Sequence, residues 1–396
     1  MRRWLFVFLL LPLPLSAQVP AGIAERATLT SKVLGEERAV WVRLPEGYDR
    51  TTARYPVLML TDGELQMQQT VSTVGFLEHH GRIPELIVVG ITNGGIASGD
   101  RARDLTPSNA SMTRWDGVEV PYPTSGGADR FLAFIETELI PWIDASYRTE
   151  PFRILAGHSF GGLFAIHAFV AKPGLFRGVI AASPILQWDD QLVVRKAGAL
   201  FDQAKRLPGT VHLTAGREEE ALVASVRSFQ ELAKTKAPKG LRVSATFMKD
   251  EDHGSVVLRS YYDGLRRVFA GWKPAVDEIG RYEASLEELV NHYARLSKSY
   301  GYTVTPPEAV LNLYGYQRLR EGKVDEAIEA LTMNTRNWPE SPNTYDSLGE
   351  VHEARGELYV AERFYRKAVE KSQGKNDPRE KAYRGNLDRV TRKLKR

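Results

Sequence analysis

The first 272 residues alternate between short apolar runs and segments with helical periodicity. The runs at residues 55–60 and 85–91 are almost wholly apolar, as expected for strands buried on both faces. Similar patterns predict further strands at residues 25–34, 38–44, 153–157, 178–182, 210–215 and 241–247. Helices are predicted at residues 66–78, 128–146, 160–170 and 261–272. Strands that alternate with helices predict an α/β fold, with a mainly parallel sheet covered by helices on both faces.

Residues 92–127 interrupt this alternation. They are rich in Gly, Ser, Thr, Asp and Pro, and they carry Arg101, Arg103, Trp115 and Tyr122. Long irregular segments are usually either functional or disordered. We therefore expect a functional loop in this part of the chain.

After about residue 273 the strands cease, and the pattern becomes helical with an internal repeat of 34 residues. Small residues recur at this period, in the pairs Gly315 and Gly349, Gly322 and Gly356, and Ala327 and Ala361. The period and positions resemble the tetratricopeptide family of helical hairpins. We expect a helical linker over residues 273–307 and tetratricopeptide-like repeats over residues 308–396, packed on the linker or on the α/β domain. The repeats imply a possible protein partner.

The N-terminus has the organisation of a secretory signal peptide. Two arginines follow Met1, residues 4–15 are apolar with two prolines, and small residues precede a cleavage site after Ala17. An uncleaved anchor is the alternative. No other apolar run approaches the length of a membrane span. We therefore expect a signal peptide at residues 1–17, a periplasmic or secreted protein, and no stable membrane insertion after cleavage.

The composition narrows the function classes. The chain is 43% hydrophobic and 26% charged, as in ordinary soluble proteins. Its formal charge of +4 is too small to indicate a nucleic-acid partner, and we interpret the basic residues 389–396 as a solvated helix face. The chain has no cysteine, which excludes disulfides, thiolate catalysis and cysteine metal ligands.

The most informative motif is Gly157-His158-Ser159-Phe160-Gly161, which ends an apolar run and precedes a helical pattern. A serine at the apex of a sharp turn between strand and helix is typical of a nucleophile elbow. Side chains at the two glycine positions would collide with the neighbouring strand and helix. The helix N-terminus also favours negative charge beside Ser159. An ordinary glycine-rich turn is the alternative interpretation.

A serine hydroxyl needs a base to act as a nucleophile at neutral pH. Of the eight histidines, His253 lies in a polar loop after the last predicted strand. The others fall within the elbow, on predicted helices, in a strand or in the helical region: His158, His79, His80, His167, His212, His292 and His352. We therefore expect His253 to take and return the Ser159 proton.

The base needs an acid that fixes its tautomer, and the chain order places this acid after the strand at residues 210–215. Three candidates follow that strand: Glu218, Glu219 and Glu220. We assign Glu219, the third residue after Gly216, with Glu218 as the next choice. Glutamates that merely begin a solvated helix are the alternative.

An oxyanion hole needs two N–H donors. One is expected from the backbone of Phe160, and the other from the loop after residues 55–60, at Gly63 or Glu64. Asp62 and Glu64 form an acidic pair, but nothing else completes a metal-ligand set. We therefore expect neither a metal nor a cofactor.

Several segments together resemble the putative-esterase family of α/β hydrolases, which includes enterochelin (ferric siderophore) esterases and esterase D-like enzymes. They are the elbow with the preceding residues 147–156, the loop at residues 101–107, the segment from Ser183-Pro184 to Trp188-Asp189, and Asp252-His253-Gly254-Ser255. The resemblance covers about residues 25–272. It implies an α/β-hydrolase fold over residues 18–272, and hydrolysis of a small-molecule carboxylic ester through an acyl-enzyme on Ser159.

The resemblance also implies a siderophore-type, enterobactin-like substrate. Arg101 and Arg103 are then expected to hold an anionic catecholate or carboxylate, and Trp188, Trp115 or Tyr122 to stack on its ring. In some siderophore esterases of the family a Ser–His pair suffices without an acid. Two other functions stay open, namely a repeat-based scaffold with a vestigial hydrolase domain and an acyltransferase that uses the same triad.

Overall fold

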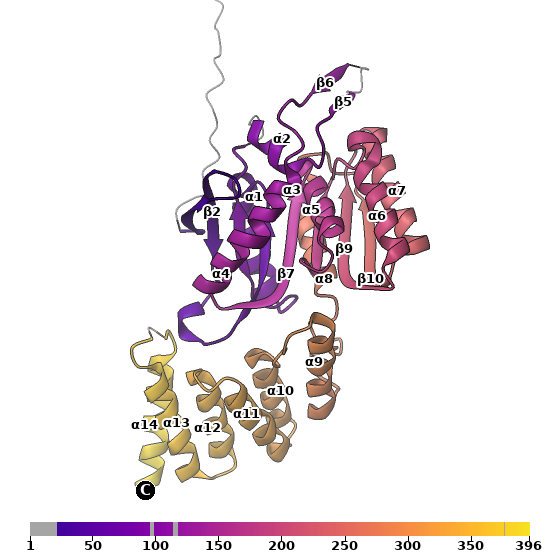
Figure 1. Ribbon diagram of the computed structural model, residues 1–396. Helices are drawn as coiled ribbons and strands as arrows, with labels where there is room; N and C mark the ends of the chain where they lie inside the picture. Colours follow the sequence, from indigo (N-terminus) through magenta and orange to yellow (C-terminus); the bar gives the residue numbers. More distant parts are fainter. Residues whose placement is uncertain (1–21, 96–98, 114–117, 376) are drawn as a thin grey trace, which may run out of the picture.

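The computed structural model describes residues 22–95, 99–113, 118–375 and 377–396. The signal peptide predicted over residues 1–17 lies outside these described residues. An α/β domain forms the upper part of the molecule in Figure 1, and a row of helices lies beneath it. The two parts follow one another along the chain.

The α/β domain is built on one eight-stranded sheet with the order β1-β2-β4-β3-β7-β8-β9-β10. The strands from β4 to β10 are parallel, whereas β2 pairs antiparallel with both β1 and β4. Every residue of β3, β4 and β8 is buried, as the continuous apolar runs predict. The mainly parallel sheet confirms the expected α/β-hydrolase fold class. The strands are β1 (Glu25–Ser31), β2 (Glu36–Arg43), β3 (Tyr55–Leu60), β4 (Ile87–Ile91), β7 (Thr149–His158), β8 (Gly178–Ala182), β9 (Arg206–Ala215) and β10 (Lys239–Phe247).

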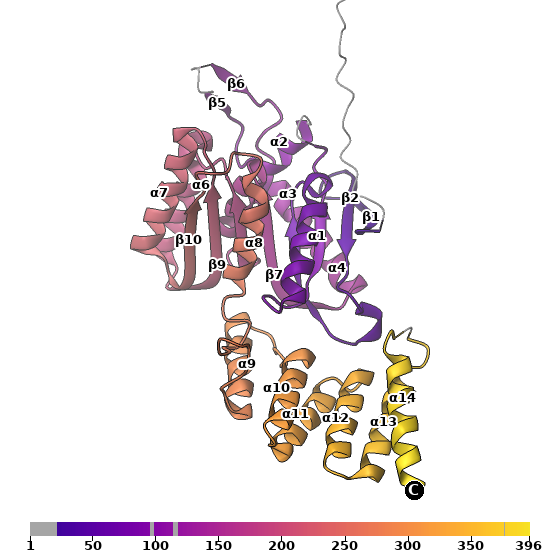
Figure 2. The ribbon, with the colours of Figure 1, turned by 180° about the vertical axis from the view of Figure 1, so that it is seen from behind.

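Helices cover both faces of this sheet. Helices α1 and α8 cover the face seen in Figure 2, and their Val74 and Leu265 belong to the same hydrophobic core as Ile154 of β7. Helices α5 and α7 cover the face seen in Figure 1, and their Phe164 and Phe229 belong to the other core together with Leu155. Alternate residues of β7 therefore enter opposite cores. The helices of this domain are α1 (Gly63–His79), α2 (Gly99–Leu105), α3 (Ala128–Phe134), α4 (Ile140–Ser146), α5 (Phe160–Ala171), α6 (Trp188–Gln203), α7 (Glu220–Lys236) and α8 (Val256–Val268), with a short 3₁₀ turn η1 (Tyr48–Arg50).

Two segments differ from the sequence-based expectation. The helix expected over residues 128–146 is continuous but contains a π-helical turn, η2 (Ile135–Leu139), between α3 and α4. The segment 92–127 is not wholly irregular, because it contains α2 and a two-stranded hairpin of β5 (Ser111–Thr113) and β6 (Glu119–Pro121). This hairpin projects above the sheet in both views (Figures 1 and 2).

The helical region contains two hairpins, α10–α11 and α12–α13, related by the 34-residue period. Gly315 and Gly349 occupy equivalent close contacts, since a Cβ there would lie 2.6 Å from Leu331 and 2.8 Å from Tyr365. Small residues are thus needed where paired helices touch. The helices are α9 (Leu286–Tyr300), α10 (Glu308–Arg320), α11 (Val324–Asn337), α12 (Pro342–Ala354), α13 (Leu358–Ser372) and α14 (Glu380–Leu394).

The helical region packs against the amino ends of the sheet strands. Phe152, near the start of β7, contacts the ring of Tyr300 with centroids 5.0 Å apart. Arg177, just before β8, donates to the carbonyl of Ser299 at 2.9 Å. The repeats therefore lie at the rim opposite the carboxyl ends of the strands (Figure 1). No helix within the described part of the chain has the length and apolarity needed to cross a bilayer.

Candidate active site

Ser159 forms the apex of the turn between β7 and α5. Its backbone has φ 61° and ψ −118°, a conformation that residues with side chains rarely adopt. The flanking glycines are required sterically, because a Cβ on Gly157 would lie 2.2 Å from the Gly161 carbonyl and one on Gly161 would lie 2.2 Å from Thr61 Oγ1. This is the collision that the motif predicts. A strained residue held in place by its surroundings is typical of functional sites.

A histidine and a buried acid meet at the same rim of the sheet. His253 Nδ1 lies 2.7 Å from Glu218 Oε2, across the loops that follow β10 and β9. Ser183, directly after β8, donates its hydroxyl to the other carboxylate oxygen of Glu218. The Glu218 side chain is 4% exposed and that of His253 is 43% exposed. A buried carboxylate thus orients an accessible imidazole.

The electrostatics of Glu218 suit this arrangement. Burial raises the pKa of its carboxyl group, but hydrogen bonds from His253 and Ser183 outweigh burial and bring the pKa below its ordinary value. An ionised Glu218 keeps the proton on His253 Nδ1, which leaves Nε2 as the acceptor for a proton from a nucleophile. The pair can therefore serve as the base and acid of a triad.

The acid assignment from sequence requires correction by one residue. Glu219 is exposed and lies at the N-cap of α7, where its carbonyl accepts from Leu222 and Val223. Glu220 begins α7 and is also exposed. The prediction of Glu219 from its spacing to Gly216 is wrong, because the turn after β9 directs the side chain of Glu218 towards the histidine loop.

The elbow and the histidine loop are joined through His158. Its Nε2 donates to the His253 carbonyl at 2.6 Å, and the two ring centroids are 4.7 Å apart. Ser159 and His253 therefore share one edge of the sheet. Among the hydrogen bonds of the described residues none joins Ser159 Oγ to His253, and such contacts often tighten only when substrate binds.

The expected oxyanion donors also lie at this edge. Phe160 opens α5 and Gly63 opens α1, and the first amides of a helix have no partner within it. The two helices follow β7 and β3, which are neighbours in the sheet. The carboxylate of Glu64 accepts hydrogen bonds from the backbone amides of Asn93 and Gly95, in the loop that follows β4.

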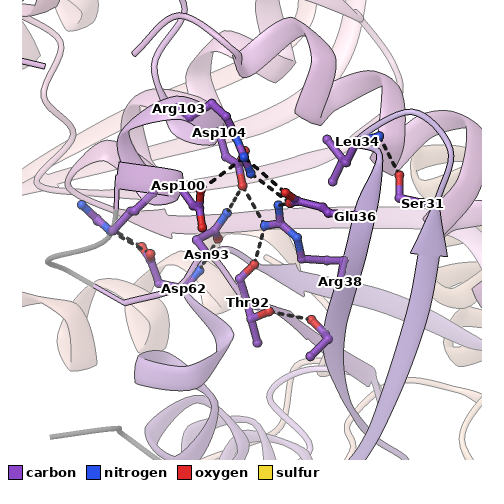
Figure 3. A network of polar contacts seen from close by, with 12 residues as sticks. Ser31, Leu34, Glu36, Arg38, Asp62, Thr92, Asn93, Asp100, Arg103 and Asp104 are labelled. Carbon is purple, nitrogen blue, oxygen red and sulfur yellow. Dashed lines mark hydrogen bonds and ion pairs between the residues drawn. The ribbon is translucent and has the colours of Figure 1, made fainter. Parts of the chain in front are cut away.

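The two arginines expected to bind substrate are instead part of a polar network. Arg101 is 7% exposed and forms a bidentate ion pair with Asp62, at 2.7 and 3.0 Å. Arg103 pairs with Asp104 at 2.8 Å and with Glu36 at 2.9 Å. Figure 3 shows Arg103 directed towards these carboxylates. Neither guanidinium is free for an anionic substrate, because each is already neutralised within the protein.

Trp188 is likewise not an accessible stacking surface. It is 1% exposed and donates its Nε1 proton to Ser108 Oγ at 3.1 Å. Its ring supports Phe160 edge-on, with centroids 5.4 Å apart, and both rings contact the partly buried Tyr122. Tyr122 thus carries the accessible part of this aromatic group. Trp115, the other expected stacking residue, lies outside the described residues.

Sequence reasoning missed Ser183 and the role of His158. Ser183 directly follows a predicted strand, at the same rim as Ser159. This position is the sequence feature that could have identified it as a site residue. No group of three or more potential metal-ligating side chains comes together within the described ranges.

A pH effect follows from the buried state of His158. Burial and then the neighbouring His253 lower the pKa of His158 to about 4, whereas a histidine in an unfolded chain titrates near ~6.5. Between pH ~4 and pH ~6.5 the unfolded chain binds more protons than the folded chain. The free energy of unfolding therefore keeps its full value above pH ~6.5 and falls as the pH drops towards ~4.

The substitution His158→Gln keeps an N–H donor and removes the titration. We expect urea unfolding to show that this variant loses about 2 kcal/mol less stability than the wild type between about pH 7 and pH 5. Replacing the exposed His80 by glutamine is the matched control and should leave the wild-type dependence unchanged. Equal losses in His158→Gln and wild type would contradict a neutral His158.

Comparison with known proteins adds an independent line of evidence. A family model described as putative esterase matches residues 31–253. The ferri-bacillibactin esterase BesA of Bacillus subtilis is 31% identical over 220 residues, which cover 52% of this chain and 75% of that protein. The siderophore enterobactin esterase of Emericella nidulans is 29% identical over 248 residues, covering 52% of this chain and 79% of that protein.

Solved structures show the same similarity. An IroE-like serine hydrolase from Shewanella oneidensis has a TM-score of 0.69 and 29% identity, and the match covers 79% of this chain and 99% of that one. The BES protein from Bacillus cereus has a TM-score of 0.56 and 28% identity, covering 63% of this chain and 97% of that one.

Proposed function

The chain belongs to the putative esterase family and is a carboxylic-ester hydrolase, and on that premise we propose that it works through an acyl-enzyme on Ser159. The observation that supports this mechanism most strongly is the Glu218–His253 contact of 2.7 Å beside the strained elbow. This contact provides an oriented base at the rim of the sheet where Ser159 lies. Ser159 is the only serine of this sequence in a nucleophile-elbow motif. The expected Glu219 has no part in this proposal.

The proposed reaction has two halves. His253 Nε2 takes the Ser159 proton while Oγ attacks the ester carbonyl, and the amides of Phe160 and Gly63 or Glu64 stabilise the oxyanion. Collapse breaks the C–O bond, and the alcohol leaves with the proton from His253. In the second half, His253 takes a proton from water, which attacks the carbonyl of the acyl-enzyme. The C–O bond to Ser159 then breaks and His253 returns the proton to Oγ, which releases the acid and restores Ser159.

For the substrate we propose a siderophore ester of the trilactone type. The support is the similarity to two proteins named for such substrates, BesA and the enterobactin esterase. Tyr122, the accessible member of the aromatic group that it forms with the buried Phe160 and Trp188, also suits an aryl-bearing ester.

This substrate proposal predicts a defined product pattern. Incubation with enterobactin or bacillibactin should first give a linear product one water heavier than the trilactone, detected by liquid chromatography with mass detection. Further hydrolysis should give fragments whose masses sum to that of the trilactone plus one water per ester bond opened. A triamide analogue with the same aryl groups and no ester bond is the matched control and should stay intact. Turnover of p-nitrophenyl acetate with no opening of either trilactone would contradict the substrate class and leave the esterase chemistry standing.

We further propose that the enzyme works in the periplasm or outside the cell. The support is the pattern of the first 17 residues, which precede the described part of the chain. The helical repeats lie at the opposite rim of the sheet from the site (Figure 1), so the proposal gives them no part in the chemistry.

A further inference from the structure

Arg101 is a buried cation that the mechanism above does not use. It comes from α2 and is 7% exposed. Its Nε and Nη2 donate to the two carboxylate oxygens of Asp62 at 2.7 and 3.0 Å. The same Nη2 also donates to the backbone carbonyl of His158 at 3.2 Å. One planar guanidinium thus contacts two separate loops.

These two loops carry the expected oxyanion donors. Asp62 is the N-cap residue of α1 and has a left-handed backbone with φ 53° and ψ 43°. Its ψ angle sets the direction of the Gly63 amide that follows it. His158 precedes Ser159, and its carbonyl lies two residues before the Phe160 amide. Arg101 therefore bridges the residue that aims one donor and the turn that carries the other.

The Asp62 end of the bridge is itself held firmly. The Asp62 amide donates to Asn93 Oδ1 at 3.0 Å, and Asn93 Nδ2 donates to Asp104 at 3.3 Å. Asp104 in turn accepts from Arg38 at 2.7 Å. Figure 3 shows Asn93 between Asp62 and Asp104, and Arg38 directed at Asp104. A network of hydrogen bonds and ion pairs therefore holds Asp62 in place, and Arg101 links this network to the elbow.

We infer that Arg101 is a positioning residue of the oxyanion hole, which sets the spacing between the Phe160 amide and the amides that follow Asp62. This inference rests on the proposed serine mechanism. Hydrogen-bond donors stabilise an oxyanion only when they are held at the positions that its charge will occupy. A bidentate guanidinium is suited to this task because its fork is rigid and stays charged.

The other role for a cation here is to bind an anionic substrate. That role conflicts with the geometry, because both oxygens of Asp62 are engaged and the guanidinium packs 5.5 Å from the Phe160 ring centroid. Binding a substrate anion would require breaking a buried ion pair.

The two roles predict different kinetics in Arg101→Lys and Arg101→Ala. A positioning role lowers kcat by about 10–10³-fold with KM within about twofold, because the lost interaction acts in the transition state. The loss is the same for p-nitrophenyl butyrate, which is neutral, and for mono-p-nitrophenyl succinate, which is anionic. Unchanged kcat, or a rise in KM confined to the anionic ester, would overturn the inference.

Three controls separate positioning from loss of fold. Arg43→Ala removes a largely buried arginine that forms a comparable bidentate ion pair with Glu78, at 3.0 and 2.9 Å, at the far end of α1 from Asp62, and it should keep wild-type kcat. The double variant Arg101→Met, Asp62→Asn removes both buried charges together, and it should retain a cooperative melting transition while still losing kcat. Added guanidinium ion should restore part of the activity of Arg101→Ala and should leave the kcat of Arg43→Ala unchanged. Full kcat in the folded double variant would overturn the inference.

Failure of this inference differs from failure of the proposed function. If Ser159→Ala is inactive while Arg101 variants keep kcat, the serine mechanism stands and the positioning role falls. If Ser159→Ala keeps activity, the mechanism on which the inference rests falls.

Discussion

Replacing Ser159 by alanine is expected to lower kcat/KM for p-nitrophenyl butyrate by about 10⁴–10⁶-fold. The physical reason is that the acyl-enzyme needs Oγ, and no neighbouring hydroxyl occupies the apex of the elbow. Ser183, the other serine at this rim, is fully buried and donates to Glu218, so it cannot substitute. Stopped-time assays at high enzyme concentration give the residual rate.

His253→Ala should cause a loss similar to that of Ser159→Ala, and the double variant should lose little more, because the two groups act as one unit. Ser255→Ala is a matched control: it removes the hydroxyl of an exposed serine in the histidine loop. That control should retain nearly full activity. A Ser159→Ala enzyme with more than about one tenth of wild-type kcat/KM would remove Ser159 from the mechanism.

The second large effect distinguishes neighbouring glutamates. Glu218→Gln should lower kcat by about 10²–10⁴-fold, because the amide no longer stabilises the imidazolium or fixes the Nδ1 proton of His253. Glu219→Gln should stay within about twofold of wild type, since its side chain is exposed and its N-cap contact uses the backbone. Steady-state kinetics of both variants on one neutral ester make the comparison.

The pair serves as its own control, because both changes remove one negative charge from the same loop. A larger loss in Glu219→Gln than in Glu218→Gln would return the acid to the residue expected from the sequence. Equal, small losses in both would mean that Ser159 and His253 act without an acid.

The elements around the site follow closely from the sequence. Residues 55–60 are continuously apolar and form β3 with the same bounds, because a strand buried on both faces needs apolar residues at every position. The elbow also follows from its sequence motif, because a Cβ at Gly157 or Gly161 would clash with neighbouring atoms and only glycine fits there. His253 emerges because few histidines follow a strand in a polar loop.

The details that the sequence did not predict depend on direction and on distant partners. Glu218 and Glu219 are adjacent, and only the turn after β9 decides which of them meets His253. Arg101 looked like a free cation because its partner Asp62 lies 39 positions earlier in the chain. The burial of Trp188 depends in the same way on Ser108 and Tyr122, which belong to a loop whose path the sequence pattern did not reveal.

The most direct test of the account is covalent labelling with a fluorophosphonate, in which Oγ displaces fluoride and forms an O–P bond. The account predicts one label per chain, on the peptide that contains Ser159, with ester hydrolysis lost in proportion and labelling slowed strongly in His253→Ala. A label on another residue, or a fully labelled Ser159 in an enzyme that still hydrolyses esters, would contradict it.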